Sequence, residues 1–143
     1  MRIERVLRPQ AERAAALLRW LQLETLPHDE PLPTDKGWWW VAYQDDQPAA
    51  FAALCRSVRW RDTGYLCRAG VLRAYRGAGL QKRLIRVRER WARRMGMRWL
   101  VTDTFDNPAS ANSLIACGFR MFTPSAPWAA EGACYWRKRI LED

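Results

Sequence analysis

The segment from Val71 to Gln81 constrains the fold more than any other part of the chain. It places two glycines, Gly77 and Gly79, between a short apolar stretch and a long amphipathic one. Glycine lets the backbone turn without a Cβ clash and lets a ligand approach main-chain N–H groups. The first turn of a helix carries unpaired N–H groups and the positive end of the helix dipole. The segment therefore predicts a strand, a turn and a helix N-terminus that together can bind a phosphate group.

The spacing of apolar residues predicts that strands and helices alternate along the chain. Apolar residues recur every three or four positions from Leu80 to Met95, which is typical of an amphipathic helix, and Gly96 is expected to end it. Asn107 before Pro108 predicts the N-cap of a shorter helix. In full, we expect strands at residues 1–7, 38–43, 49–58, 65–71, 99–104, 119–122 and 134–140, and helices at 11–23, 80–95 and 107–118.

Length and composition favour one globular domain. The chain has 143 residues, close to the commonest domain size, and 49% of them are hydrophobic, so it can bury a core. It contains no run of apolar residues long enough to span a membrane and no apolar signal core at its N-terminus, so we expect a cytoplasmic protein. Four scattered cysteines and a single histidine argue against a metal site and favour reduced thiols.

The order of these elements and motifs resembles the GNAT superfamily, the GCN5-related N-acetyltransferases. A strand ends at Val71, Arg76-Gly77-Ala78-Gly79 opens a helix, and Asn107 precedes Gly118-Phe119 at the family spacing. The family pattern is Arg/Gln-x-x-Gly-x-Gly/Ala; Arg76 and Gly79 match it, and Gln81 takes the last small position. The resemblance is specific over residues 65–122 and only topological over residues 1–64.

The resemblance implies a single GNAT-like domain over residues 1–143 with a mixed α/β fold. A central, mostly antiparallel sheet of six or seven strands would splay between strands 4 and 5, with helices on both faces. Acetyl-CoA would be the co-substrate, and it would lie in the cleft between those strands. Gly70 would form a bulge that opens the strand. The residues implied to bind acetyl-CoA are Ala69, Gly70, Val71, Arg76, Gly77, Ala78, Gly79, Leu80, Gln81 and Asn107.

The chain departs from the family pattern at both catalytic positions. Many members have a tyrosine seven residues after the asparagine, where this chain has Leu114, and many have a glutamate five residues before it, where this chain has Thr102. Asp103 lies one step further, on the opposite face of the expected strand. The candidates that remain for the proton donor are Ser113, Ser110 and Tyr135. Several candidates remain for the base: Glu24, His28, Asp29 and Glu30 after the first helix, Asp103 and Asp106 on the other wall of the cleft, and Glu131 in the loop before the last strand.

An alkylamine attacks only when it is neutral, so the site must desolvate the amine, accept its proton with a base, or pass the proton to a base through water. The pKa of an alkylamine lies near 10, so only about one molecule in a thousand is neutral at pH 7. The resemblance implies that the acceptor side of the cleft lies where Pro-rich sequence follows the first helix; the loop before the last strand is a further candidate. An acidic cluster there would bind a cationic acceptor. The candidate acceptor-binding residues are Glu24, His28, Glu30, Trp40 and Glu131, with Asp29 nearby.

These observations predict an acyl-CoA-dependent N-acyltransferase that moves an acetyl group to a primary amine by direct attack in a ternary complex. The acceptor would be a small molecule or a peptide, the acyl group could also be propionyl or succinyl, and a homodimer is possible. The net charge of +9 supports an alternative. In it, a catalytically lapsed GNAT-like module binds nucleic acid or an acidic partner through a basic helix face. That face comprises Lys82, Arg83, Arg86, Arg90, Arg93, Arg94 and Arg98.

Overall fold

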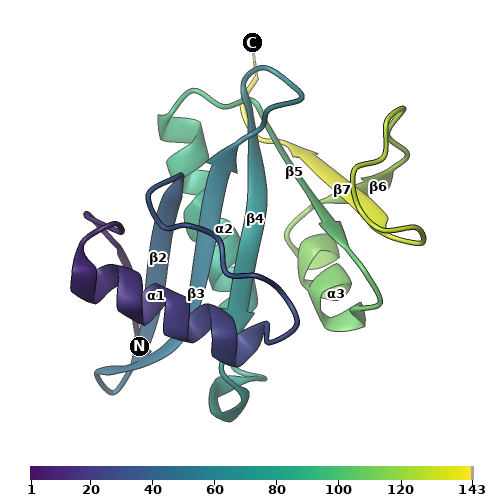
Figure 1. Ribbon diagram of the computed structural model, residues 1–143. Helices are drawn as coiled ribbons and strands as arrows, with labels where there is room; N and C mark the ends of the chain where they lie inside the picture. Colours follow the sequence, from purple (N-terminus) through teal and green to yellow (C-terminus); the bar gives the residue numbers. More distant parts are fainter. Residues whose placement is uncertain (143) are drawn as a thin grey trace.

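The computed structural model describes residues 1–142, which form a seven-stranded sheet with three α-helices (Figure 1). The strand order is β1-β2-β3-β4-β5-β7-β6, and neighbours are antiparallel except for the parallel pair β4–β5. The expected mixed α/β fold is confirmed. The elements are β1 (Arg2–Arg5), α1 (Glu12–Thr25), β2 (Trp38–Gln44), β3 (Gln47–Arg56), β4 (Thr63–Val71), η1 (Arg73–Tyr75), α2 (Leu80–Arg94), β5 (Trp99–Thr104), α3 (Pro108–Ala116), β6 (Arg120–Phe122) and β7 (Cys134–Arg139).

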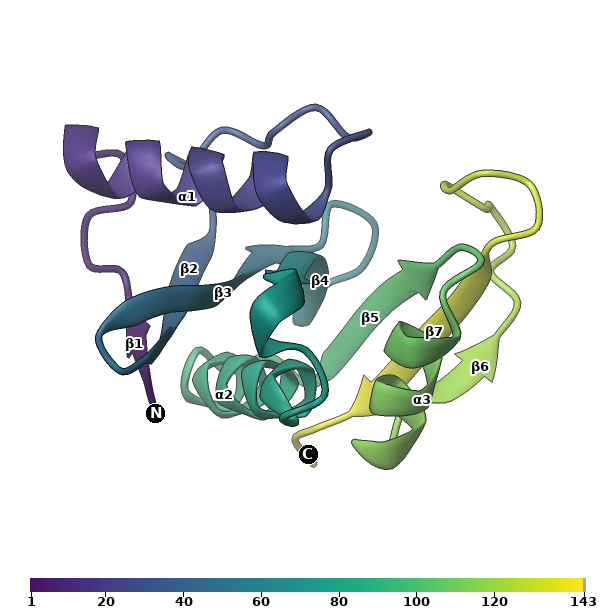
Figure 2. The ribbon, with the colours of Figure 1, turned by 90° about the horizontal axis from the view of Figure 1, so that it is seen from below.

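The helices cover both faces of the sheet, as expected. Figure 2 shows α1 on one face and α2 and α3 on the other. Alternate residues of β3 point to opposite faces, so that Phe51 and Ala53 pack against α1 while Ala52 and Leu54 pack on the α2 side. Small side chains dominate β3 because it is buried on both faces, and they let the helices approach the sheet closely.

The sheet splays between β4 and β5, as the resemblance implied. The two strands pair only over Thr63–Tyr65 and Trp99–Val101, and they diverge beyond that point (Figure 1). The pairing of β4 with β3 is irregular just where this divergence begins. Ala53 pairs with Arg68 and Cys55 with Tyr65, so two residues of β4 oppose one residue of β3. This is a β-bulge, which increases the local twist and turns β4 away from β5.

Gly70 does not form the bulge that was expected of it. It pairs regularly with Phe51, and the bulge lies at Leu66 and Cys67 instead. Gly70 is required for packing, because a Cβ atom at this position would collide with the side chain of Thr25 at the end of α1. The glycine therefore allows α1 to lie close over the sheet.

Replacing Gly70 by alanine is expected to lower the free energy of unfolding by about 1–3 kcal/mol, since the new methyl group overpacks the contact with Thr25. Urea denaturation monitored by tryptophan fluorescence measures the change. Thr25→Gly removes both colliding atoms of that side chain, the hydroxyl and the Cβ, so Gly70→Ala should cost less in a Thr25→Gly background. An unchanged midpoint for Gly70→Ala would contradict this explanation.

The predicted helix ends are confirmed where their capping chemistry is explicit. The Asn107 side chain accepts a hydrogen bond from the Ser110 N–H at 3.1 Å, and Pro108 is the first residue of α3. Gly96 follows the end of α2 with φ at +79°, a conformation that favours glycine. Among the described helices, none is long and apolar enough to cross a membrane.

Candidate active site

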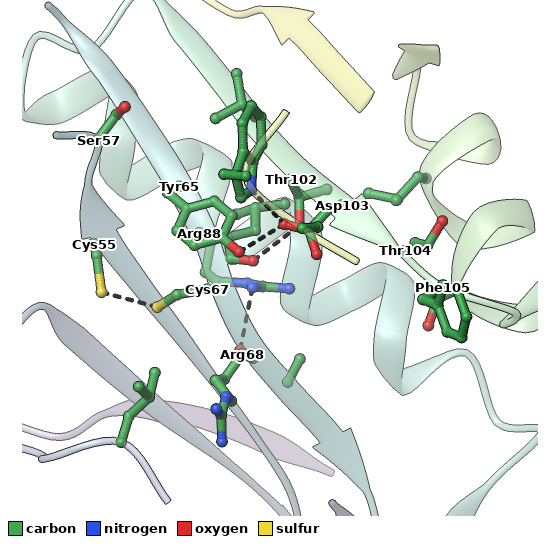
Figure 3. Close-up of a pocket in the computed structure, with 18 of the residues that line it drawn as sticks. Cys55, Ser57, Tyr65, Cys67, Arg68, Arg88, Thr102, Asp103, Thr104 and Phe105 are labelled. Carbon is green, nitrogen blue, oxygen red and sulfur yellow. Dashed lines mark hydrogen bonds between the residues drawn. The ribbon is translucent and has the colours of Figure 1, made fainter. Parts of the chain in front are cut away.

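A cavity of about 810 Å³ opens where β4 and β5 diverge (Figure 3). It passes between the two faces of the sheet. Gln81, Asn107 and Ser110 line it on the side of α2 and α3, while Arg56 and Trp60 line it at the end of β3 and in the following loop. Its volume lies in the upper part of the range for ligand pockets. It is therefore large enough to hold the reacting ends of two substrates.

The edge of β4 forms one wall of this cavity. Tyr65 is the last residue of β4 that pairs with β5, and the residues from Leu66 to Ala69 line the cavity. The Thr102 hydroxyl donates to the Leu66 carbonyl at 3.0 Å, so one side chain of β5 bridges the start of the gap. An open strand edge can hydrogen-bond to the amides of an extended ligand as a further strand would.

The glycine turn leads into the cavity through the first turn of α2. Gly77 and Gly79 have φ angles of +85° and +76°, and open space faces the position of a Cβ atom at each. The first hydrogen bond of α2 runs from the Arg83 N–H to the Gly79 carbonyl at 3.2 Å. The amides before Arg83 precede this bond and are available to an anion. The Leu80 side chain is buried in the core, so that this residue can offer only its backbone.

The other residues expected to bind the co-substrate differ in their placement. Ala69, Gln81 and Asn107 line the cavity, whereas Gly70, Val71 and the Arg76–Leu80 segment do not. The Arg76 side chain donates to the Val71 carbonyl at 3.1 Å, so it braces the end of β4. This bond occupies a backbone group that the sequence had assigned to the co-substrate.

Of the three proton-donor candidates, the structure brings only Ser110 into the cavity. Its hydroxyl accepts a hydrogen bond from Gln81 Nε2 at 2.8 Å, which joins α3 to α2. Ser113 is buried on α3 and does not line the cavity. Tyr135 also lies outside the lining; its hydroxyl accepts from the Ala129 N–H at 3.0 Å. Leu114 lines the cavity with an aliphatic side chain.

Asp103 lies in the cavity wall and is held by two aromatic residues. Its Oδ2 atom accepts from the Tyr65 hydroxyl at 2.7 Å and from Trp128 Nε1 at 2.9 Å (Figure 3). Burial, followed by the hydrogen bond to Asp103, raises the pKa of Tyr65, so the phenol keeps its proton. Trp128 packs edge-on against Tyr135 with ring centroids 4.5 Å apart. The carboxylate is therefore oriented by a rigid aromatic cluster.

Sequence reasoning missed Tyr65 and Trp128. Tyr65 pairs with Val101, which lies two residues before Asp103, so the two polar side chains share a face of the sheet. The β4–β5 register would have revealed this, but the sequence does not specify that register. Trp128 lies in a loop whose course depends on its tertiary contacts. A lone tryptophan in a Pro- and Ala-rich segment was the only available signal.

The expected acceptor loops reach the cavity, but through other residues than those predicted. Glu24, His28, Glu30 and Glu131 are exposed and do not line it. Their chain neighbours do: Leu26, Asp29, Leu32, Ala129 and Ala130. Trp40 is 2% exposed and belongs to the core on the α2 side of the sheet. The acidic wall expected for a cationic acceptor is thus reduced to Asp29 and Asp103.

The remaining expectations concern metals and the basic helix face. Residues 1–142 contain no group of three or more His, Cys, Asp or Glu side chains arranged to hold a metal ion. In the C-terminal half of α2, Arg93 pairs with the buried Glu89 at 2.7 Å and also donates to the Ile140 carbonyl. The guanidinium of Arg94 lies over the Trp91 ring. Part of the basic face is therefore engaged within the protein itself.

The family model described as Acetyltransferase (GNAT) family matches residues 9–119. The chain belongs to this family. The expected family is thereby confirmed. No curated protein matches the chain in sequence.

Solved structures share the fold of this GNAT chain at low sequence identity. A Bacillus subtilis acetyltransferase in complex with CoA has a TM-score of 0.75 and 19% identity, covering 98% of this chain and 99% of that one. A ribosomal-protein-alanine N-acetyltransferase from Brucella melitensis has a TM-score of 0.73 and 15% identity, covering 98% and 100%. A Salmonella typhimurium acetyltransferase structure that contains acetyl-CoA has a TM-score of 0.72 and 17% identity, covering 100% and 96%.

Proposed function

We propose that this protein transfers an acetyl group from acetyl-CoA to a primary amine by direct attack within a ternary complex. One observation carries the proposal: the β4–β5 cavity extends from Gln81 in the first turn of α2, where free amides can bind an anion, to an oriented carboxylate, Asp103. Two structural neighbours contain CoA or acetyl-CoA, which supports the same co-substrate here. The acceptor amine would enter from the side of Asp29 and the loop after β3.

Acetyl-CoA would bind mainly to backbone groups. Its pyrophosphate would accept hydrogen bonds from amides between Gly77 and Gln81, and its pantetheine arm would follow the open edge of β4. Asn107 supports this arrangement, because its Oδ1 atom is bonded to the Ser110 N–H while its amide nitrogen makes no hydrogen bond within residues 1–142. That nitrogen is available to a pantetheine carbonyl.

Asp103 would accept the proton of the attacking amine, directly or through one water molecule. Tyr65 and Trp128 both donate to Oδ2, which leaves Oδ1 free of hydrogen bonds within residues 1–142. The amine nitrogen forms a bond to the thioester carbon, its proton passes to the Asp103 carboxylate, and the carbon–sulfur bond then breaks. The amine attacks in its neutral form, which lies roughly 4 kcal/mol above the ammonium at pH 7, and a base in this position takes the proton that the nitrogen loses as the bond to carbon forms.

Ser110 would donate a hydrogen bond to the departing thiolate. Because Gln81 donates to its oxygen, the hydroxyl proton of Ser110 remains available to the cavity. Thiolate departure makes a small demand, since a thiol has a pKa near 8.5. This accounts for a leucine at position 114, where many family members have a tyrosine.

Replacing Ser110 by alanine is expected to lower kcat by about 10- to 100-fold, the range of one hydrogen bond to a charged acceptor. The decrease in kcat is measured from the steady-state rate of thiol release. Ser113→Ala is the matched control, because it makes the same substitution on α3 outside the cavity lining. Equal losses in the two variants would assign the effect to α3 stability rather than to the thiolate.

A thiol-release screen with acetyl-CoA and a panel of amines tests the proposed function directly. We expect thiol release that depends on the amine, and an increase in melting temperature when acetyl-CoA binds the folded state. If acetyl-CoA has no effect on either readout, the proposal fails. Duplex DNA or RNA binding with a steep salt dependence would then favour the alternative of a basic binding module.

A further inference from the structure

Arg88 is a buried cation in the wall of the cavity. Its side chain comes from the middle of α2 and is 3% exposed. Nε donates to the Leu84 carbonyl at 3.0 Å, and Nη1 donates to the Ala53 carbonyl at 3.1 Å and approaches the Arg68 carbonyl at 3.5 Å. All three contacts are to neutral backbone groups.

No carboxylate within residues 1–142 neutralises this guanidinium. Asp103 is held by Tyr65 and Trp128, and Glu89 pairs with Arg93 and Lys138 away from the cavity. Burial lowers the pKa of Arg88 to about 10, so the group still carries its charge at pH 7. An arginine this buried is normally paired, because removing an unpaired charge from water is costly.

The outer nitrogen of Arg88 faces the cavity. The bonds to backbone carbonyls use Nε and Nη1, and Nη2 has no hydrogen-bond partner within residues 1–142. Among the side-chain nitrogen and oxygen atoms of residues 1–142, only Trp91 Nε1 is both fully enclosed and without a hydrogen-bond partner. Nη2 of Arg88 has no partner either, so it is not fully enclosed, and the space that it faces is the cavity. Figure 3 shows the guanidinium beside the Arg68 carbonyl at the start of the gap between the strands.

Arg88 lies at the depth of the cavity where the reacting ends of the substrates would meet, and not near the proposed pyrophosphate site. Gln81, Ile85 and Arg88 follow one another along the cavity-facing side of α2, and Arg88 is the furthest from the helix N-terminus. It contacts β4 at Arg68, next to the bulge at Leu66 and Cys67. The pyrophosphate site proposed above lies two helical turns away, so the phosphates do not supply the missing anion.

We propose that Arg88 binds a carboxylate carried by one of the two substrates. The proposal rests on the proposed function, which brings the acyl group and the amine to this depth of the cavity. A carboxylate supplies the acceptor oxygen and the negative charge that Nη2 lacks. It belongs either to an acyl chain with a terminal carboxylate or to an acceptor such as an amino acid or a peptide with a free C-terminus. More cations near the acceptor side favour an anionic substrate: Arg56, Arg59 and Arg68.

The test compares charged and neutral substrates in two arms. In the acyl arm, calorimetry measures the affinities of succinyl-CoA and acetyl-CoA. In the acceptor arm, kcat/KM is measured with acetyl-CoA for common amino acids and for their carboxamides. We expect one arm to show a preference for the carboxylate of about 10- to 100-fold, the range of a charge-assisted hydrogen bond. The arm that shows it identifies the substrate that carries the group.

Variants of Arg88 then assign that preference to the guanidinium. Arg88→Met should bring the charged-to-neutral ratio close to one, and Arg88→Lys should retain part of it. Arg90→Met is the matched control, since Arg90 is exposed on the same helix and does not line the cavity. Circular dichroism checks that each variant is folded. If Arg88→Met does not fold, the charged-to-neutral ratios of the wild type and of Arg88→Lys test the proposal: the ratio should be lower in Arg88→Lys than in the wild type.

Two results would overturn the proposal: a wild type with no charge preference in either arm, or a folded Arg88→Met variant that keeps the full preference. Failure of the proposed function gives a different pattern. If no amine releases thiol, the proposed acetyl transfer is wrong, and only the affinities for succinyl-CoA and acetyl-CoA then test whether Arg88 binds a carboxylate. Equal thioester affinities would then also exclude a carboxylate at Arg88.

Discussion

Gly79→Trp is expected to weaken acetyl-CoA binding at least about 100-fold while the protein remains folded. Gly79 precedes α2, and the space in front of its Cα atom is open. An indole ring there would cover the free amides at the start of the helix, which are the groups proposed to bind the pyrophosphate. Several charge-assisted hydrogen bonds would be lost together. Calorimetric titration with acetyl-CoA measures the effect.

Gly96→Trp is the matched control for this substitution. Gly96 lies at the other end of α2 with φ at +79°, close to the +76° of Gly79, and open space also faces its Cβ position. Both variants therefore have a similar backbone strain of about 1–2 kcal/mol. Only Gly79→Trp should lose the co-substrate. Unchanged affinity in Gly79→Trp would show that the pyrophosphate binds elsewhere.

Asp103→Asn is expected to lower kcat by about 100- to 10,000-fold, the usual range for loss of a general base, with little change in acetyl-CoA affinity. Asparagine preserves the size of the side chain, and its oxygen can still accept from Tyr65 and Trp128. It cannot accept the amine proton. Activity should recover at high pH, where more of the amine is neutral before it binds. Thiol-release kinetics from neutral to alkaline pH measure both effects.

Asp106→Asn controls for the loss of one negative charge near the cavity. Asp106 is exposed, does not line the cavity and has φ at +46°, which asparagine also tolerates. Tyr65→Phe removes one of the bonds that orient Asp103, and it should have a smaller effect than Asp103→Asn. If Asp103→Asn stays within about threefold of the wild type, the proton of the amine leaves by another route.

Much of the fold follows from local sequence patterns. The Leu80–Met95 periodicity and Gly96 predicted α2 nearly to the residue, and Asn107 with Pro108 predicted the cap of α3. These signals are reliable because each depends on neighbours within one or two turns of the chain. The resemblance then supplied the splayed sheet, which pattern alone would not have shown.

The site was less predictable, because its residues come together through pairing between distant strands. Asp103 was a candidate by position, but Tyr65 and Trp128, which orient it, depend on the β4–β5 register and on a loop. Gly70 was assigned to a bulge, although the structure uses it to admit α1. Trp40 was assigned to the acceptor pocket, although the side of the sheet that it faces places it in the core.

The sequence by itself determined the glycine turn, the helix that follows it and the order of strands and helices along the chain, because backbone conformation and apolar spacing are local properties. Only the tertiary structure decided which polar side chains share the cavity and which charge remains there without a partner. Arg88 shows the difference. In the sequence it is one of many arginines on a basic helix, and only its burial between α2 and β4 distinguishes it from the exposed ones. Burial and pairing depend on groups far apart in the chain, so they exist only once the sheet has formed.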